Sequence, residues 1–156
     1  MIKNYKVIRK DKVNYGEDSL LTDKVIEVIE FHHNFDIQFI ELHKRENGFE
    51  VDAVIWALTK EKNLERCIGI ELKDRDLYKA IEQAVERRQY YHYFYIVTGN
   101  YPSFAFVHSQ YPKLAEHGIG VIYSNPKYEI ASLLQPSNYI HPKYFQKRLI
   151  GFLNIL

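Results

Sequence analysis

The chain has little cysteine, proline and glycine, and it has no long hydrophobic run. Its 156 residues include one cysteine, five prolines and seven glycines. The single cysteine, Cys67, excludes an internal disulfide and a cysteine-based zinc site, and it fits a reducing, intracellular (cytoplasmic) setting. No stretch of about 18 apolar residues is present, so we expect no membrane span. The first residues also lack the apolar segment of a signal peptide.

The chain also lacks a large excess of positive or negative charge. The net charge is +1, whereas nucleic-acid-binding modules are often strongly basic. Five Lys or Arg against one Asp give residues 1–12 a net charge of +4, and four against one Glu give residues 127–156 a net charge of +3. Each end could contact phosphates or form an ordinary solvated surface. A phosphate loop, a nucleophile elbow and a His-Glu-x-x-His motif are all absent, which excludes the enzyme classes that depend on them.

The hydrophobic pattern predicts one mixed α/β domain over residues 1–156, with a core at about 16–124 and an extension at about 125–156. The expected element order is αβββαβαβ(β)α, with helices packed on a central sheet. We expect helices at about 18–33, 74–91, 109–116 and 142–156. We expect strands at about 35–43, 49–58, 64–73, 93–98 and 120–123, with one more at about 130–134. An Asn47-Gly48 turn links the first two strands.

The strands at 49–58 and 64–73 are expected to form an antiparallel hairpin about the polar turn at residues 60–63. In that register the numbers of opposed residues sum to 123, so Asp52 falls opposite Glu71. Residues two apart on a strand share a face, and Lys73 therefore joins these two acids. The opposite face is predicted to be the buried side, and it carries Val51, Ala53, Ile55 and Ala57 against Ile68, Ile70 and Leu72.

Two acids brought together between otherwise apolar strands need compensation. Like charges at short range repel, and a carboxylate taken out of water loses hydration. A divalent cation would relieve both costs, and Mg²⁺ prefers oxygen ligands. A lysine beside the cation can orient a water or stabilise charge that develops on a phosphate. Asp52, Glu71 and Lys73 therefore indicate metal-assisted phosphodiester hydrolysis.

The segment Val51-Asp52-Ala53 followed by Ile70-Glu71-Leu72-Lys73 resembles the motif of the PD-(D/E)XK nuclease superfamily. This superfamily includes restriction endonucleases, Holliday-junction resolvases and RecB-like nucleases. The helix that follows, Lys79 to Tyr90, looks like the helix after the motif in several branches, where a glutamine or basic residue faces the site. The resemblance covers roughly residues 16–124. Val51 departs from it, because it stands where the motif name has proline.

The resemblance implies a restriction-endonuclease-like fold and a role for each motif residue. Asp52 and Glu71 would bind Mg²⁺ or Mn²⁺, with help from the Leu72 carbonyl. Lys73 would contact the attacking water or the scissile phosphate, and Gln83 is the best match for the helix residue that faces the site. Many members add a glutamate from the first helix. Here Glu17 is the best candidate for that acid, with Glu27 and Glu30 as rivals.

Other residues have two interpretations each. Arg87, Arg88 and Tyr90, together with Tyr91, could clamp phosphates or stack on an unpaired base, or they could simply pack. We expect His32 and His33 to be solvated at a helix end, because adjacent helical residues point in different directions. We expect Cys67 to be a packed thiol. Gly118-Ile119-Gly120 is expected to be a helix-to-strand turn, since it lacks the third glycine of a dinucleotide-binding motif.

The function that follows is a metal-dependent DNA endonuclease, acting alone or as a homodimer. A non-cleaving nucleic-acid-binding or interaction module on the same fold is the alternative from a different class, and a nuclease for RNA would share the chemistry. Apolar residues of the segment 149–156 could complete the core or form a dimer contact.

Overall fold

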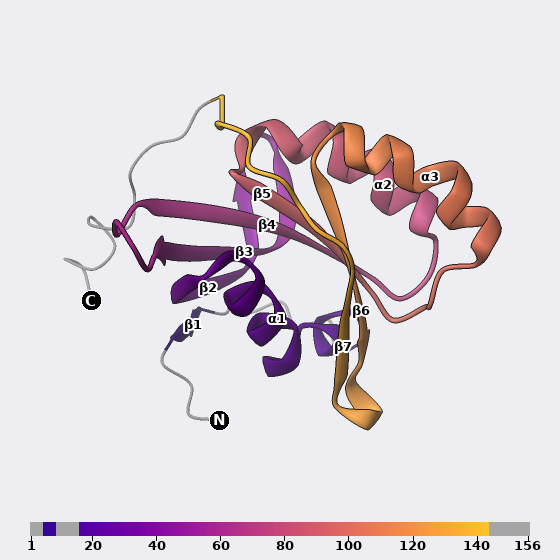
Figure 1. The fold of residues 1–156 in the computed structure, drawn as a ribbon, viewed down its shortest axis with the longest axis horizontal. Coiled ribbons are helices and arrows are strands. Elements are labelled where there is room, and N and C mark those ends of the chain that lie inside the picture. The colour runs from indigo at the N-terminus through magenta and orange to yellow at the C-terminus, as the bar shows by residue number, and fades with distance from the viewer. Residues whose placement is uncertain (1–4, 9–15, 144–156) are drawn as a thin grey trace.

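The computed structural model describes residues 5–8 and 16–143, and it shows an α/β fold with a seven-stranded mixed sheet and three helices (Figure 1). The strands lie in the sheet in chain order, and their bounds are β1 Lys6–Ile8, β2 Phe35–Glu46, β3 Phe49–Thr59, β4 Glu65–Lys73, β5 Tyr93–Thr98, β6 Ile119–Asn125 and β7 Ile130–Gln135. The helices are α1 Asp23–His33, α2 Leu77–Arg87 and α3 Phe104–Glu116, and the 3₁₀ turns are η1 Asp18–Leu20, η2 Arg88–Tyr90 and η3 Pro126–Tyr128.

The sheet combines an antiparallel half with a parallel half. The β2–β3, β3–β4 and β6–β7 pairs are antiparallel, and the β1–β2, β4–β5 and β5–β6 pairs are parallel. Parallel neighbours need a crossover, and α2 and α3 supply those after β4 and β5. The carboxyl ends of β4, β5 and β6 therefore lie at one edge of the sheet, where α/β proteins often bind ligands.

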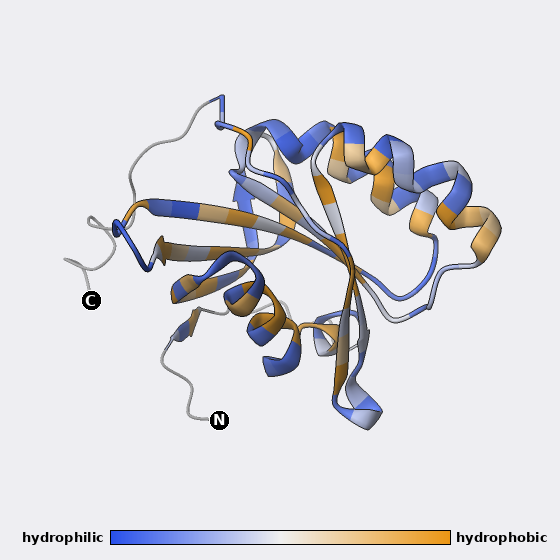
Figure 2. Ribbon diagram, in the orientation of Figure 1, coloured by the Kyte–Doolittle hydropathy of each residue, from blue (hydrophilic) through white to orange (hydrophobic). Residues whose placement is uncertain are grey.

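Hydrophobic cores lie on both faces of the sheet. In the first, which we call the α1 core, Val25 and Ile29 pack against Ile55, Ile68 and Ile70. In the second, which we call the α2–α3 core, the main members are Ala80, Ile81, Leu114, Val54 and Phe94. Figure 2 shows the apolar strands at the centre and hydrophilic residues along the outer sides of the helices. Within the described residues, no helix is both long and apolar enough to cross a membrane.

The helix boundaries differ from the predicted ones in three places. The first predicted helix is divided into η1 and α1, and Thr22 caps α1 by accepting a hydrogen bond from the Val25 N–H. The second ends as an α-helix at Arg87. The third begins at Phe104, where Ser103 provides the N-cap, and it continues through Pro112. The predicted helix at 142–156 and the apolar cluster at 149–156 fall almost entirely outside the described residues.

Val51 was predicted to share a face with Ala53, and this prediction is wrong. Val51 is fully buried in the α2–α3 core, whereas Ala53 lies in the α1 core. The strand opposite explains the change. His43 on β2 has a left-handed backbone (φ 53°), and the β2–β3 pairing passes from Leu42↔Ala53 to Lys44↔Val51 across it. The regular alternation of side chains is interrupted at this step, beside Asp52.

The sheet extends beyond the predicted core at 16–124. β1 was not predicted; it pairs with β2, and its neighbour Tyr5 donates a hydrogen bond of 2.8 Å to Asp23. After β7, the buried Ser137 hydroxyl donates to the Gly118 carbonyl at 2.7 Å and accepts from the Phe94 N–H at 2.9 Å. Segments from both ends of the chain thus complete the sheet.

Candidate functional site

The candidate site lies where the ladder between β3 and β4 ends. The pairs run from Leu58↔Glu65 to Ala53↔Ile70, which confirms the predicted register for this part of the hairpin. Beyond the last pair, β3 remains paired with β2, and β4 remains paired with β5 as far as Lys73↔Thr98. Asp52 and Glu71, which the register would oppose, are the next residues on their strands.

Asp52 links the two strands at this point. Its Oδ2 atom accepts a hydrogen bond of 2.8 Å from the backbone N–H of Leu72. A buried backbone donor needs a partner, and the side chain of Asp52 provides one where the strand ladder no longer does. Burial raises the pKa of the Asp52 carboxyl, while the bond from Leu72 lowers it, and the net direction is upward.

Glu71 is almost completely buried, with 2% of its surface exposed. Its Oε1 atom forms an ion pair with Nη1 of Arg87 on α2. Burial and the nearby charge of Asp52 raise the pKa of Glu71 to about 8, although Arg87 acts in the opposite direction. The two predicted acids are therefore close to each other, and Glu71 is already in contact with a cationic side chain of the protein, that of Arg87.

Lys73 and Glu17 complete the charged groups around Asp52. Lys73 is half-buried, and its charge lowers the pKa of Asp52, whereas the charge of Glu17 raises it. Among the residues that the structure describes, the Lys73 ammonium has no hydrogen bond or ion pair. The Oε2 atom of Glu17 accepts a hydrogen bond of 3.3 Å from the backbone N–H of Asp74, directly after the end of β4.

The structure separates Glu17 from its two rivals. Glu17 precedes η1 rather than standing in α1, and it lies beside the site. Glu27 instead pairs with Lys24 on α1 at 3.5 Å. The charges that act on Glu30 come from Lys60, Asp36 and Glu27. Of the three candidate acids, Glu17 is the one that the structure brings to Asp52.

The helix α2 presents Gln83 and Arg87 from one side. Residues four apart on a helix are neighbours on its surface, and Arg87 contacts Glu71. The buried Oε1 atom of Gln83 and the buried Nε atom of Arg87 have no hydrogen-bond partner within the described part of the chain. The Arg87 guanidinium also lies over the Phe49 ring, 4.9 Å from its centre. An unpaired buried acceptor one helical turn before the residue that contacts Glu71 is an unusual arrangement, because buried polar atoms are nearly always bonded.

Arg88, one of the residues predicted to contact nucleic acid or to pack, is packed in the protein interior. Its side chain is 3% exposed and donates hydrogen bonds only to backbone carbonyl oxygens. These belong to Tyr91 and Asn138 at 2.6 Å and to His92 and His117 at 3.1 Å. The packing alternative holds for this residue, which ties η2 and the chain after β7 to the end of α3.

The aromatic residues after α2 are also largely engaged in packing. Tyr90 is half-buried, and its ring lies 5.5 Å from that of Phe49. Tyr91 is 1% exposed, and its hydroxyl donates to Glu46 at 2.9 Å. Of the residues predicted to contact nucleic acid, Arg87 contacts Glu71, and the half-buried Tyr90 keeps part of its surface open to solvent.

Three further predictions have clear outcomes. His32 is exposed as expected, but His33 is not solvated: it shares a 2.7 Å hydrogen bond with the Tyr95 hydroxyl, and burial lowers its pKa to about 4. Cys67 is a buried free thiol, as predicted, and it lies 3.4 Å from Nδ1 of His92. Gly118, with φ 68°, lies in the predicted turn between α3 and β6, whereas Ile119 and Gly120, predicted to belong to the same turn, are the first residues of β6.

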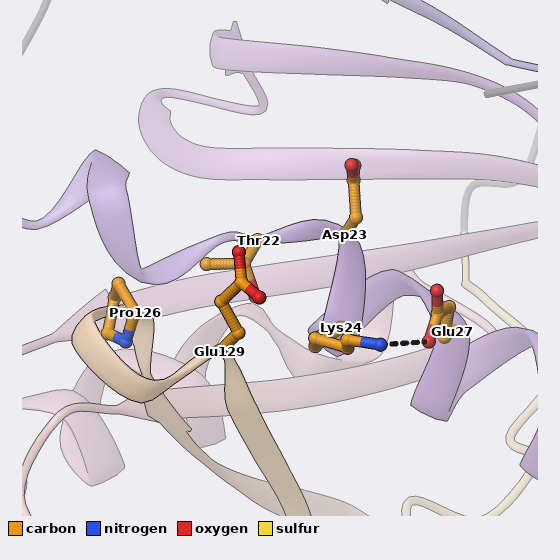
Figure 3. Close-up of a pocket in the computed structure, with 6 residues that line it drawn as sticks. All are labelled: Thr22, Asp23, Lys24, Glu27, Pro126 and Glu129. Carbon is orange, nitrogen blue, oxygen red and sulfur yellow. Dashed lines mark ion pairs between the residues drawn. The ribbon is translucent and has the colours of Figure 1, made fainter. Parts of the chain in front are cut away.

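A surface pocket of about 380 Å³ lies away from these residues, between the start of α1 and the η3 turn (Figure 3). It is lined by Thr22, Asp23, Lys24, Glu27, Pro126 and Glu129. Figure 3 shows Lys24 turned toward Glu27 and Asp23 pointing away from that pair. Glu27 is the one candidate residue among those that line the pocket, and it is the acid that pairs with Lys24 rather than with the hairpin, so we place the chemistry at the hairpin.

The site offers a pair of acids rather than a larger cluster of side chains that could ligate a metal. No group of three or more His, Cys, Asp or Glu side chains positioned to hold a metal ion is found within residues 5–8 and 16–143. Asp52, Glu71 and the unpaired Gln83 oxygen are nonetheless the kind of oxygen donors that a hard divalent cation prefers.

The comparisons with known proteins support the fold alone. No model of a protein family matches the chain, and no curated protein matches it. Among solved structures, the chain is similar to SPO1766, a protein of unknown function from Silicibacter pomeroyi. The TM-score is 0.52 at 12% sequence identity, and the match covers 83% of this chain and 77% of the other. A likeness at this identity extends to the arrangement of helices and strands, and activity has to be argued from the site.

Proposed function

We propose that this chain is a Mg²⁺- or Mn²⁺-dependent endonuclease that hydrolyses phosphodiester bonds of DNA. The observation that carries the proposal is the pair formed by Asp52 and Glu71 at the end of the β3–β4 ladder. These carboxyls come from facing strands, and the pKa of each is raised, so the protein alone does not fully compensate their charge. A bound divalent cation would compensate both acids.

The order of elements supports the same proposal. The series α1, β2, β3, β4, α2 and β5 has the αβββαβ order of the restriction-endonuclease-like core that the motif resemblance implies. Within this series, Asp52 lies on the second strand, Glu71 and Lys73 lie at the end of the third, and Gln83 lies on the helix that follows. These are the positions at which the PD-(D/E)XK resemblance places the metal ligands, the lysine and the helix residue.

The residues present fit a hard divalent cation. Asp52 and Glu71 would hold it with the Leu72 carbonyl, and the unpaired Gln83 oxygen is a further acceptor on the same side of the sheet. When bound, such a cation activates a water and polarises the scissile phosphate. Lys73, whose ammonium has no partner among the described residues, would stabilise the charge that grows on that phosphate. Glu17 would add a negative charge beside Asp52 and so favour the cation.

The direct test compares cleavage of DNA by the wild-type chain, Glu71→Gln and Lys73→Met, each with Mg²⁺ and with EDTA. Glu50→Gln is the matched control, because Glu50 is on β3 near Asp52 and pairs at the surface with Arg45. We expect Mg²⁺-dependent cleavage by the wild type and by Glu50→Gln, with losses of roughly a hundredfold or more in the two site variants. Equal cleavage by all four proteins would overturn the proposal. The same assay with RNA in place of DNA shows which of the two polynucleotides is the substrate.

The ion pair between Arg87 and Glu71 favours a second candidate, a non-cleaving nucleic-acid-binding module on the same fold. In that protein the Arg87 guanidinium would be the permanent partner of the buried acid, and a cation would not be needed. Arg87→Met distinguishes the two. In an endonuclease, removal of the guanidinium leaves Glu71 free for the cation, and Mg²⁺ should raise the melting temperature more than in the wild type. In a binding module, the variant is destabilised and Mg²⁺ does not restore its stability.

A further inference from the structure

Three exposed aromatic side chains lie beside the candidate site, and we call them the aromatic rim: Tyr78, Tyr101 and Phe104. They are 57%, 65% and 86% exposed, respectively. Large aromatic side chains dominate binding interfaces, and three of them so exposed in one region indicate a surface that binds a partner.

The rim is adjacent to the site through the chain and through the sheet. Tyr78 is near the start of α2, which follows the end of β4 at Lys73. The N–H of Gly99 donates a hydrogen bond of 3.3 Å to the carbonyl of Lys73, so the segment leading to Tyr101 starts beside the proposed lysine. Both segments follow parallel strands and emerge at the same edge of the sheet (Figure 1).

Two rings of the rim, those of Tyr78 and Tyr101, each pack against a less exposed ring. Tyr78 meets Phe106 edge to face, with the ring centres 5.1 Å apart, and Tyr101 meets Tyr123 in the same way at 5.1 Å. Phe104 lies parallel to His108 at 6.3 Å. Between the first two pairs is a shallow hollow of about 390 Å³, lined by Tyr78, Tyr101 and Phe106 among others. The rings of Tyr78 and Tyr101 are therefore held in position while much of their surface stays open to solvent.

The charges around the rim are of both signs, because Asp74 and Glu82 are exposed acids on the same segment as Tyr78. Arg75 and Lys79 are exposed, and their side chains form no ion pair within the described part of the chain. Asp76 is engaged as the N-cap of α2, where its carboxylate accepts from the Lys79 N–H at 3.2 Å. Residues 99–115 contain no Asp or Glu, so the second half of the rim carries no carboxylate that would repel a phosphate.

We propose that the aromatic rim stacks on unpaired nucleotides of DNA and so directs a single-stranded segment of the substrate toward Lys73. Stacked aromatic rings combined with free cationic side chains are the usual means of binding single strands, because every base has a π-face whereas a duplex buries its bases. The inference rests on the proposed nuclease for the role of Lys73, but binding at the rim can be measured without cleavage.

The test measures binding of a fluorescent oligothymidylate and of a duplex of equal length to the full chain in EDTA, by fluorescence anisotropy. We expect the single strand to bind more tightly, and we expect Tyr78→Ala, Tyr101→Ala and Phe104→Ala each to weaken that binding roughly tenfold. Tyr101→Trp should retain affinity, because it keeps a stacking ring. Phe31→Ala is the matched control, since Phe31 is a 92% exposed aromatic on α1 outside the rim.

The two proposals fail in different ways. If the rim variants weaken single-strand binding but no protein cleaves DNA in Mg²⁺, the proposed role of the rim is supported and the proposed nuclease activity is overturned. If the rim variants cleave DNA like the wild type, and duplex and single strand bind with equal affinity, the proposed nuclease activity stands and the proposed role of the rim is overturned. A concentration-dependent dimer that dissociates in Phe104→Ala would also overturn it, because the occupant would then be a second copy of the chain.

Discussion

The carboxylate of Asp52 accepts a hydrogen bond of 2.8 Å from the backbone N–H of Leu72, and this bond joins β3 to β4 one step beyond their last ladder pair. The same side chain thus has two roles in our proposal. One oxygen, Oδ2, holds the strands together, and the carboxylate as a whole contributes negative charge to the proposed metal site.

The two roles of Asp52 can be separated by choice of substitution. In Asp52→Asn the amide oxygen can still accept from Leu72, so we expect stability close to that of the wild type and a loss of cleavage of roughly a hundredfold or more. In Asp52→Ala the Leu72 N–H loses its partner, and unfolding by urea should show a further cost of about 1–3 kcal/mol. If both variants cleave DNA normally, Asp52 is only a structural acceptor.

Glu17 gives a second prediction, with two matched controls on α1. Its charge acts on Asp52, whereas Glu27 and Glu30 are influenced by groups elsewhere. We expect Glu17→Gln to weaken Mg²⁺ binding, measured by calorimetry, by roughly 10- to 100-fold, as is usual for groups that support a ligand set. Glu27→Gln and Glu30→Gln should bind Mg²⁺ like the wild type. Equal affinity in all three variants would remove Glu17 from the site.

The hairpin register could be predicted from the sequence because two independent signals agree. The polar turn at residues 60–63 sets the pairing, and the apolar residues on either side of it alternate in phase with that pairing. The same reasoning does not apply to Val51, because the left-handed backbone of His43 on the neighbouring strand interrupts the alternation. A non-glycine residue with positive φ has no reliable signature in the sequence, so this local reversal could not be foreseen.

The roles of Arg87 and Arg88 show a second limit. Both arginines fall within the helix predicted at residues 74–91, and from the sequence either could face the site. Arg88 continues the row of Ile81 and Ala84, which are buried, and this spacing was a signal for burial. The ion pair of Arg87 with Glu71 depends on how α2 docks on the sheet, which is decided by tertiary packing. Strand β1 could not be predicted either, because three residues are too few to show the alternation of apolar and polar side chains that marks a strand.

Arg88 yields a third prediction, about stability rather than recognition. Its guanidinium donates to four backbone carbonyls, and a lysine cannot reproduce that planar set of donors. We expect Arg88→Lys and Arg88→Ala to lower the free energy of unfolding by about 3 kcal/mol or more, because several buried acceptors lose their partner. At a temperature where the variants remain folded, their affinity for DNA should equal that of the wild type. Normal stability together with reduced affinity would restore the predicted contact with nucleic acid.

The fourth prediction concerns the dependence of stability on pH, which follows from the raised pKa of Glu71. The folded chain retains a proton on this carboxyl up to a pKa of about 8, whereas the unfolded chain releases it near the ordinary pKa of a glutamate, 4.5. The contribution to stability is therefore fully present below about pH 4.5 and is lost as the pH rises toward 8. Without metal, we expect the free energy of unfolding of the wild type to fall across this range relative to that of Glu71→Gln, which cannot ionise at this position.

Mg²⁺ should reverse this loss at the upper end of the range. At pH 8 Glu71 has lost its proton in about half of the molecules, and a cation that binds its carboxylate together with Asp52 in the folded chain alone stabilises that state. We expect Mg²⁺ to raise the melting temperature of the wild type at pH 8 and to have a much smaller effect at pH 5. Glu71→Gln should show neither the pH dependence nor the response to Mg²⁺, whereas Glu50→Gln should show both. A wild-type response to Mg²⁺ that persists in Glu71→Gln would place the cation elsewhere, and the acids at the end of the ladder would then require another explanation.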